Sequence, residues 1–169
     1  MAGRVRGFTL IEMLVVLLIM GLFVGLVSSM AQPDDRGLLR LEADRLAQLL
    51  DLAATEARVS GQPIAWTRDG TGYRFWRFQE DAGWSELRGN DLLRTRSLPP
   101  GMTISGLWIE SLHSQDAMRL EFSPYGATLA YTIELALGAE RYSVEASPLG
   151  ELRIVPGGHS GENKEKIHG

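Results

Sequence analysis

The sequence contains no cysteine, and only three of its 169 residues are histidine. The absence of cysteine excludes thiol catalysis, cysteine-ligated zinc and redox sensing. The histidines have no spacing typical of a metal site, so we expect neither a metal nor a cofactor. The sequence also has no G-x-S-x-G elbow, P-loop or dinucleotide fingerprint, and we expect no enzymatic activity.

Charged side chains are missing from Met13 to Pro33, a run of 21 mostly apolar residues. As a helix this run is roughly 31 Å long, about the hydrocarbon thickness of a bilayer. Arg4 and Arg6 precede the run, and basic residues on this flank favour a cytoplasmic amino terminus. The run therefore predicts a single transmembrane helix with the rest of the chain on the far side of the membrane.

Most of the charge lies after this run, including all but two of the 17 basic and all but one of the 21 acidic side chains. This larger part of the chain is acidic overall. Nucleic-acid-binding domains carry a basic surface, so we expect no nucleic-acid partner.

Three interpretations of the apolar run compete. It is an ordinary signal anchor, a secretory signal peptide that is cut before Gln32, or a segment in which the carboxylate of Glu12 has a function. A secretory apolar region is usually about 7–15 residues, shorter than this one. A carboxylate inside a bilayer costs up to about 3 kcal/mol. Neither of the first two interpretations gives Glu12 a function that would offset this cost.

The segment GFTLIEMLVVL, which begins at Gly7, resembles the amino-terminal signature of type IV pilins and type II secretion pseudopilins. The resemblance implies that a prepilin peptidase cuts between Gly7 and Phe8, and that Phe8 is then N-methylated. It also places Glu12 where the family has its glutamate. This carboxylate would pair with the new amino terminus of a neighbouring subunit and set the register of a filament.

Glycines lie one helical turn apart in the apolar run, at Gly21 and Gly25. Such a small-xxx-small pair allows two membrane helices to approach closely, but glycine is also common in membrane helices for other reasons. Both interpretations of the pair remain open.

The next segment predicts an amphipathic linker helix over residues 34–61. Its apolar residues recur at helical spacing, at Leu39, Ala43, Leu46, Leu50, Ala53 and Ala57. The polar residues turned away from this stripe are Arg40, Glu42, Asp44, Arg45, Gln48 and Asp51. Pro33 and Gly37 predict a bend before the helix, and Gly61 and Pro63 predict its end.

From Gln62 onward the pattern changes to short strands separated by turn residues. The predicted strands are Ile64–Arg68, Tyr73–Gln79, Ser85–Leu87, Leu92–Leu98, Thr103–Ile109, Met118–Phe122, Thr128–Ala136, Tyr142–Ala146 and Leu152–Val155. The expected fold class is α+β, with a long amino-terminal helix packed on an antiparallel β-sheet or β-sandwich head.

Aromatic side chains fall on both faces of the predicted strand Tyr73–Gln79. This arrangement is typical of a strand buried on one face and partly covered on the other. The alternative is a partner surface formed by Tyr73, Trp76, Phe78 and Trp84, because interfaces favour Trp, Tyr and Arg.

Three further segments resemble H-type minor pseudopilins of type II secretion, namely Glu56–Ile64, Phe122–Gly126 and Val144–Ile154. The resemblance implies a cleaved leader (1–7), a transmembrane helix (8–33), a linker helix (34–61), a periplasmic β-rich head (62–156) and a flexible tail (157–169). It implies a structural subunit of the periplasmic pseudopilus that drives protein export, anchored by a single pass in the inner membrane.

The partners implied are the major pseudopilin, other minor pseudopilins, the prepilin peptidase, the inner-membrane assembly platform and membrane lipid. Two alternatives stay open at this point. One is a minor pilin of a type IV pilus, and the other is a periplasmic binding or sensor domain released from a signal peptide.

Overall fold

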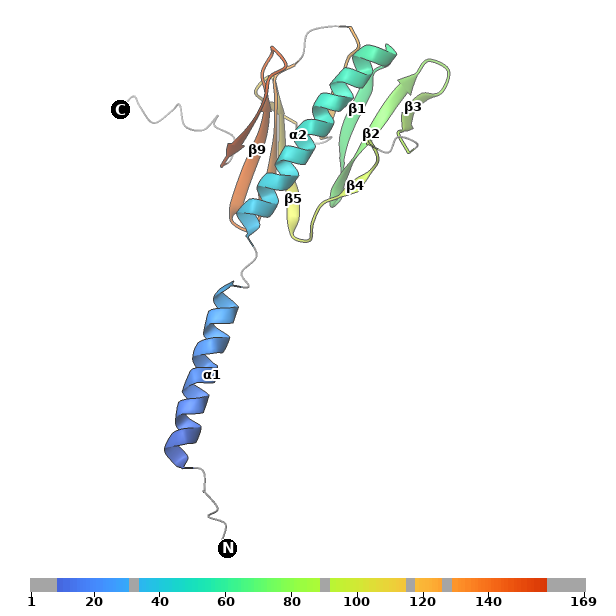
Figure 1. Ribbon diagram of the computed structural model, residues 1–169. Coiled ribbons are helices and arrows are strands. Elements are labelled where there is room, and N and C mark those ends of the chain that lie inside the picture. Colours follow the sequence, from blue (N-terminus) through green and yellow to red (C-terminus); the bar gives the residue numbers. More distant parts are fainter. Residues whose placement is uncertain (1–8, 31–33, 89–91, 115–117, 126–128, 158–169) are drawn as a thin grey trace, which may run out of the picture. The chain divides into compact units, whose positions relative to one another are not determined.

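The computed structural model describes residues 9–30, 34–88, 92–114, 118–125 and 129–157 (Figure 1). The chain divides into two compact units, Met1–Asp34 and Asp35–Gly169, and each is described by itself. Among the described residues, no helix combines the length and the apolar character needed to cross a membrane.

The amino-terminal unit contains the helix α1, Leu10–Met30. Its large apolar side chains are exposed on every side of the helix, from Leu10 to Leu26. A helix that is apolar all round is stable only in an apolar environment, supplied by lipid or by neighbouring protein. We therefore expect α1 to be covered by something outside this unit.

The second unit, which we call the head, begins with α2, Asp35–Ser60. The predicted apolar stripe is confirmed, because all six of its residues are fully buried. The helix also ends where the sequence predicts. Gly61 adopts the left-handed conformation (φ 70°) that favours glycine after a helix, and its N–H donates to the Ala57 carbonyl at 3.0 Å.

The described residues of the head form two antiparallel sheets (Figure 1). Sheet A has the order β3-β2-β1-β7, with β4 also paired to β2. Its strands are β1 (Ile64–Asp69), β2 (Gly72–Gln79), β3 (Gly83–Glu86), β4 (Arg96–Ser97) and β7 (Arg119–Phe122).

Sheet B has the order β10-β9-β8-β5-β6. Its strands are β5 (Met102–Ile109), β6 (Leu112–His113), β8 (Tyr131–Leu137), β9 (Glu140–Ala146) and β10 (Leu152–Pro156). Each predicted strand overlaps an observed one, and β6 was not predicted. The predicted strand Leu92–Leu98 shortens to β4, because the chain bends at Leu93 to bury that side chain in the core.

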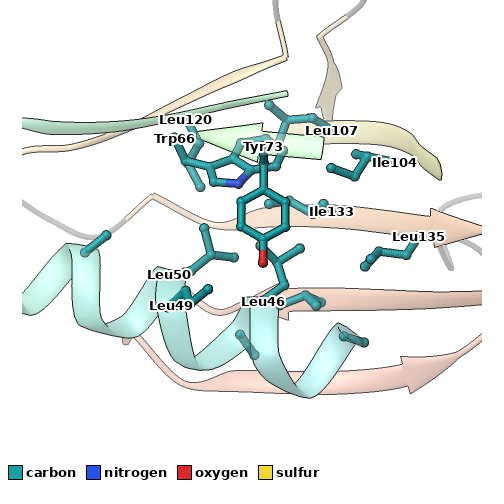
Figure 2. Packing of buried hydrophobic residues seen from close by; sticks show 14 of the residues in the cluster. Leu46, Leu49, Leu50, Trp66, Tyr73, Ile104, Leu107, Leu120, Ile133 and Leu135 are labelled. Carbon is teal, nitrogen blue, oxygen red and sulfur yellow. The ribbon is translucent and has the colours of Figure 1, made fainter. Parts of the chain in front are cut away.

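One hydrophobic core joins α2 to both sheets (Figure 2). Tyr73 and Trp66 from sheet A meet Leu46 and Leu50 from α2 in this core, and Ile133 enters it from sheet B. The predicted fold class is confirmed for the head, with α2 as the helix that packs on the sheets.

Two ion pairs fasten α2 to the two sheets at its opposite ends. Arg36 Nε donates to Glu140 Oε2 on β9 at 2.9 Å, and Arg77 Nη2 on β2 donates to Glu56 Oε1 at 2.6 Å. Both pairs are at least partly exposed, so each contributes up to about 1 kcal/mol. The buried stripe already orients α2 on the two sheets, and these ion pairs reinforce that orientation.

The expectation that Glu42 turns away from the core is wrong. Glu42 is only 6% exposed, and its carboxylate is paired with Arg45. The helical period alone places Glu42 on the polar side of α2, but the packing of the head covers that position. Burial of the ring, together with the nearby charge of Glu42, raises the pKa of Tyr73 to about 12.

Candidate assembly and partner surfaces

Of the predicted processing and assembly residues, Gly7 and Phe8 lie outside the described residues. Glu12 lies in the first turn of α1, where its N–H donates to the Thr9 carbonyl at 3.0 Å. Its side chain is exposed. A carboxylate in this turn is stabilised by the positive end of the helix dipole, and its exposure lets it meet a cation from another chain.

Gly21 and Gly25 lie on one face of α1, one turn apart. A β-carbon added at either glycine would have no neighbour within 4 Å. This face is therefore open in the isolated unit, and close packing against a second helix stays a prediction.

The predicted alternation of β2 is confirmed. Tyr73 and Phe75 point into the core, whereas Trp76 and Phe78 are half-buried on the outer face of sheet A. Tyr73 is 1% exposed, so the prediction that it belongs to a partner surface is wrong. Its ring is instead packed edge-on against Phe75, 6.1 Å away between centroids.

The outer face of sheet A carries a group of side chains that we call the aromatic surface, namely Trp76, Phe78, Trp84 and Arg119. Phe78 and Trp84 are in contact, with ring centroids 5.4 Å apart. The guanidinium of Arg119 lies 4.1 Å from the centroid of the Trp84 ring, and Trp76 Nε1 donates to Thr67 Oγ1 at 2.8 Å. The sheet thus holds these large side chains in fixed positions.

Ala65 shows how completely the aromatic surface covers the strands beneath it. Its position in β1 places its side chain on the outer face, opposite Trp76, yet it is 0% exposed. The aromatic surface is therefore a second layer over sheet A. Its own outer side remains partly exposed to solvent.

A charged cluster borders the aromatic surface on β2 and β3. Arg74 pairs with Asp69 and lies 3.9 Å from Glu86, and these carboxylates raise the pKa of its guanidinium. Hydrogen bonds from Thr95 and Arg88 lower the pKa of Glu86. The opposite charges of the cluster thus largely compensate one another.

A groove of about 750 Å³ opens beside Phe78 at the end of the aromatic surface. Three separate segments line it: the α2–β1 junction (61–63), the end of β2 with the following turn (78–81), and the loop after β7 (123–125). Its walls combine prolines and aromatic rings with the exposed carboxylates of Glu80 and Asp81.

Tyr125 stands at the mouth of this groove with 81% of its surface exposed. Its N–H donates to Ser123 Oγ at 3.2 Å, and Ser123 Oγ donates to the Tyr125 carbonyl at 2.8 Å. A β-carbon at Gly61 would lie 3.3 Å from the Tyr125 hydroxyl, so the bare backbone leaves room for the ring. The two hydrogen bonds thus fix the backbone from which this large exposed side chain projects.

The sequence did not predict this groove. The signal that the sequence does contain is Tyr125 in the segment Phe-Ser-Pro-Tyr. It directly follows a proline, whose ring fixes the proline's own backbone angle. No group of three or more His, Cys, Asp or Glu able to hold a metal occurs in the described part of the chain.

Comparison with known proteins places the chain among secretion components. Residues 42–150 match the family model of type II transport protein GspH, and residues 3–28 match the prokaryotic N-terminal methylation motif. No curated protein matches the chain.

Two solved structures share the fold of the head, both of the minor pseudopilin EpsH from the type II secretion system of Vibrio cholerae. One is 23% identical with a TM-score of 0.57, and the other is 19% identical with a TM-score of 0.62. Each match covers 72% of this chain and 98% of the other. Because this family model matches most of its length, the chain belongs to the type II transport protein GspH family, the H-type minor pseudopilins of type II secretion.

Proposed function

We propose that the chain is made as a membrane-inserted precursor, cut between Gly7 and Phe8, methylated at Phe8, and built into a periplasmic pseudopilus that drives protein export. The observation that carries this proposal is the N-terminal methylation motif over residues 3–28, joined in one chain to a GspH-type head. Members of this family are structural subunits, so the work of the chain is noncovalent association with other pseudopilins.

The amino-terminal unit supports anchoring in the inner membrane. The 21 uncharged residues from Met13 to Pro33 favour an apolar surrounding, and Arg4 and Arg6 favour a cytoplasmic amino terminus. The head then lies in the periplasm. During assembly α1 exchanges lipid for the α1 helices of other subunits, and its apolar surface is covered throughout.

Glu12 sets the register of this exchange. Cleavage after Gly7 creates a positive amino terminus, and the exposed carboxylate of Glu12 pairs with that amine on a neighbouring subunit. Each of these two charges alone is unfavourable in lipid. They form a neutral pair only when the subunit docks at one position along the filament, and this fixes the register. Prepilin peptidase, the assembly platform and the major pseudopilin are the partners that this route requires.

Mass spectrometry of the amino terminus of the protein purified from its native cells tests the proposal. We expect a chain that begins at methylated Phe8. A chain that begins at Gln32 would instead show removal of a secretory signal peptide, and a chain that retains its first seven residues would exclude processing. Either of these two results would refute the proposed route.

A further inference from the structure

We propose that the groove beside Phe78 binds an extended segment of another pseudopilin, one that presents a lysine or arginine next to an apolar or proline side chain. This inference rests on the proposed function, because that function supplies other pseudopilins as neighbours. It adds the location of the contact on the head and the chemistry of the segment that enters it.

The apolar wall of the groove fits a proline or aliphatic side chain. Pro63, Phe78, Pro124 and Tyr125 line one continuous hollow. Grooves lined by aromatic rings bind proline-rich extended segments, which lose little entropy on docking because their polyproline II conformation is already formed. Tyr125 is 81% exposed, and the hydrogen bonds between its backbone and Ser123 fix the part of the chain that carries this ring beside the groove.

The charge at the rim selects a basic neighbour. Glu80 and Asp81 line the groove, both are exposed, and neither makes an ion pair with any residue that the structure describes. Asp69 and Glu86, also on sheet A, differ in this respect, because both are paired with Arg74. Two adjacent uncompensated carboxylates favour a cation and repel an acidic segment.

The groove is continuous with the aromatic surface. Phe78 belongs to both, and it contacts Trp84, on which the Arg119 guanidinium lies. Aromatic side chains and arginine are the residues that most often carry the binding energy of protein interfaces. A segment seated in the groove would therefore continue along a surface suited to contact with protein.

The groove also lies at the end of the head where α2 finishes, since Gly61 to Pro63 form one of its walls (Figure 1). The opposite end of the head is the one where α2 starts, close to the β8–β9 turn at Gly138. A neighbouring subunit on the side of the carboxyl end of α2 would thus contact the end of the head where the groove opens. This position suits a contact between successive subunits of a filament.

A peptide with the required chemistry provides the probe. The segment Leu92–Pro100 of this chain reads LLRTRSLPP and joins two arginines to leucine and proline. We expect the dye-labelled peptide to bind the full chain in detergent micelles, measured by fluorescence anisotropy. The matched control is the same peptide with Arg94→Glu and Arg96→Glu, which should bind at least about tenfold more weakly.

Variants of the head locate the binding. Glu80→Lys combined with Asp81→Lys should weaken binding of the basic peptide about tenfold or more, and Tyr125→Ala should weaken it several-fold. Glu151→Lys is the matched control, because its side chain is 64% exposed and it precedes β10 on the other sheet. All four positions are exposed, and thermal unfolding will verify that the variants are folded. Equal binding of the two peptides, or unchanged binding by the groove variants, would overturn the proposal.

The identity of the occupant is tested in the native membrane. The chain has no cysteine, so Gln79→Cys, at an exposed residue that lines the groove, introduces one thiol for a bifunctional cross-linker and keeps both carboxylates. We expect an adduct with a different pseudopilin, and an adduct of twice the mass of the chain would show a second copy and overturn the assigned occupant. Correct processing at Phe8 with no such adduct would refute this docking site and leave the proposed function intact.

Discussion

The guanidinium of Arg119 lies 4.1 Å from the centroid of the Trp84 ring, although these residues belong to β7 and β3, at opposite edges of the four-strand path in sheet A. The two side chains therefore reach toward each other across β1 and β2. They close the layer that buries Ala65.

Arg119→Ala should lower the free energy of unfolding by about 1 kcal/mol, because it removes a cation–π contact and uncovers apolar surface. A double-mutant cycle with Trp84→Ala should give a coupling of about 0.5–1 kcal/mol in urea titrations. Glu121→Gln is the control, since it removes only the ion pair to Arg119 at 2.6 Å. Strict additivity of the two substitutions would show that the contact contributes nothing.

Stability should fall at alkaline pH through Tyr73. Its pKa is raised to about 12 in the folded head, from about 10 in the unfolded chain. Below pH 10 both states keep the proton and the contribution is fully present. As the pH rises through the folded pKa the contribution is lost, up to roughly 3 kcal/mol. Urea unfolding at intervals from pH 9 upward measures this, and burial raises the pKa of Tyr131 in the same direction.

Tyr73→Phe should remove most of the alkaline loss that Tyr73 causes. It should also leave the head at least as stable at neutral pH, because the buried hydroxyl has no hydrogen-bond partner in the described part of the chain. A clear loss of stability in Tyr73→Phe at neutral pH would reveal a partner for this hydroxyl and contradict the argument.

Gly72→Ala should break the pairing of β2 with β4. A β-carbon at Gly72 would lie 2.1 Å from the Arg96 carbonyl oxygen and 3.0 Å from the Ser97 α-carbon, so the backbone must separate. We expect a cost of about 1–3 kcal/mol and faster hydrogen exchange at the Leu98 amide, which donates to Thr71 at 2.9 Å.

The control for this substitution is Gly70→Ala. A β-carbon at Gly70 would have no neighbour within 4 Å, although its φ of 50° is itself unfavourable for alanine. This variant should lose stability without a selective change at Leu98. Equal protection of the Leu98 amide in both variants would show that β4 tolerates the extra atom.

Glu12→Ala should leave cleavage after Gly7 intact, because the substitution lies outside the proposed cut between Gly7 and Phe8, and should reduce incorporation into the filament by at least about tenfold. Glu12→Asp keeps the charge and should retain part of the incorporation. Sheared filaments and membranes, compared by immunoblot, measure both variants. If Glu12→Ala incorporated as well as the original chain, the carboxylate would have no role in register.

Local periodicity was enough to predict α2. Its stripe from Leu39 to Ala57 repeats every three or four residues, and no other secondary structure gives that spacing. The strands of the head followed in the same way from short apolar runs and from turns such as Asp69-Gly70. The amino-terminal motif at Gly7 to Glu12 predicted the family, because it fixes the order of specific residues over a short distance.

The groove and the burial of Glu42 could not be predicted, because both depend on which segments meet in space. Residues 61–63, 78–81 and 123–125 line the groove, and no local pattern shows that they converge. Glu42 occupies a polar position on the helical wheel, but in the folded head it is only 6% exposed. The sequence left Tyr73 open between the core and a partner surface for the same reason.

The attachment of α2 to both sheets has a mechanical consequence for a subunit that is pushed or pulled along a filament. Load that enters at Asp35 reaches Glu140 through Arg36 and reaches β2 through Glu56, while the buried stripe shares it along the whole helix. Densely packed interiors transmit strain with little deformation. The head should therefore move as a rigid body. Its strands should separate from one another only after α2 has been detached from the two sheets.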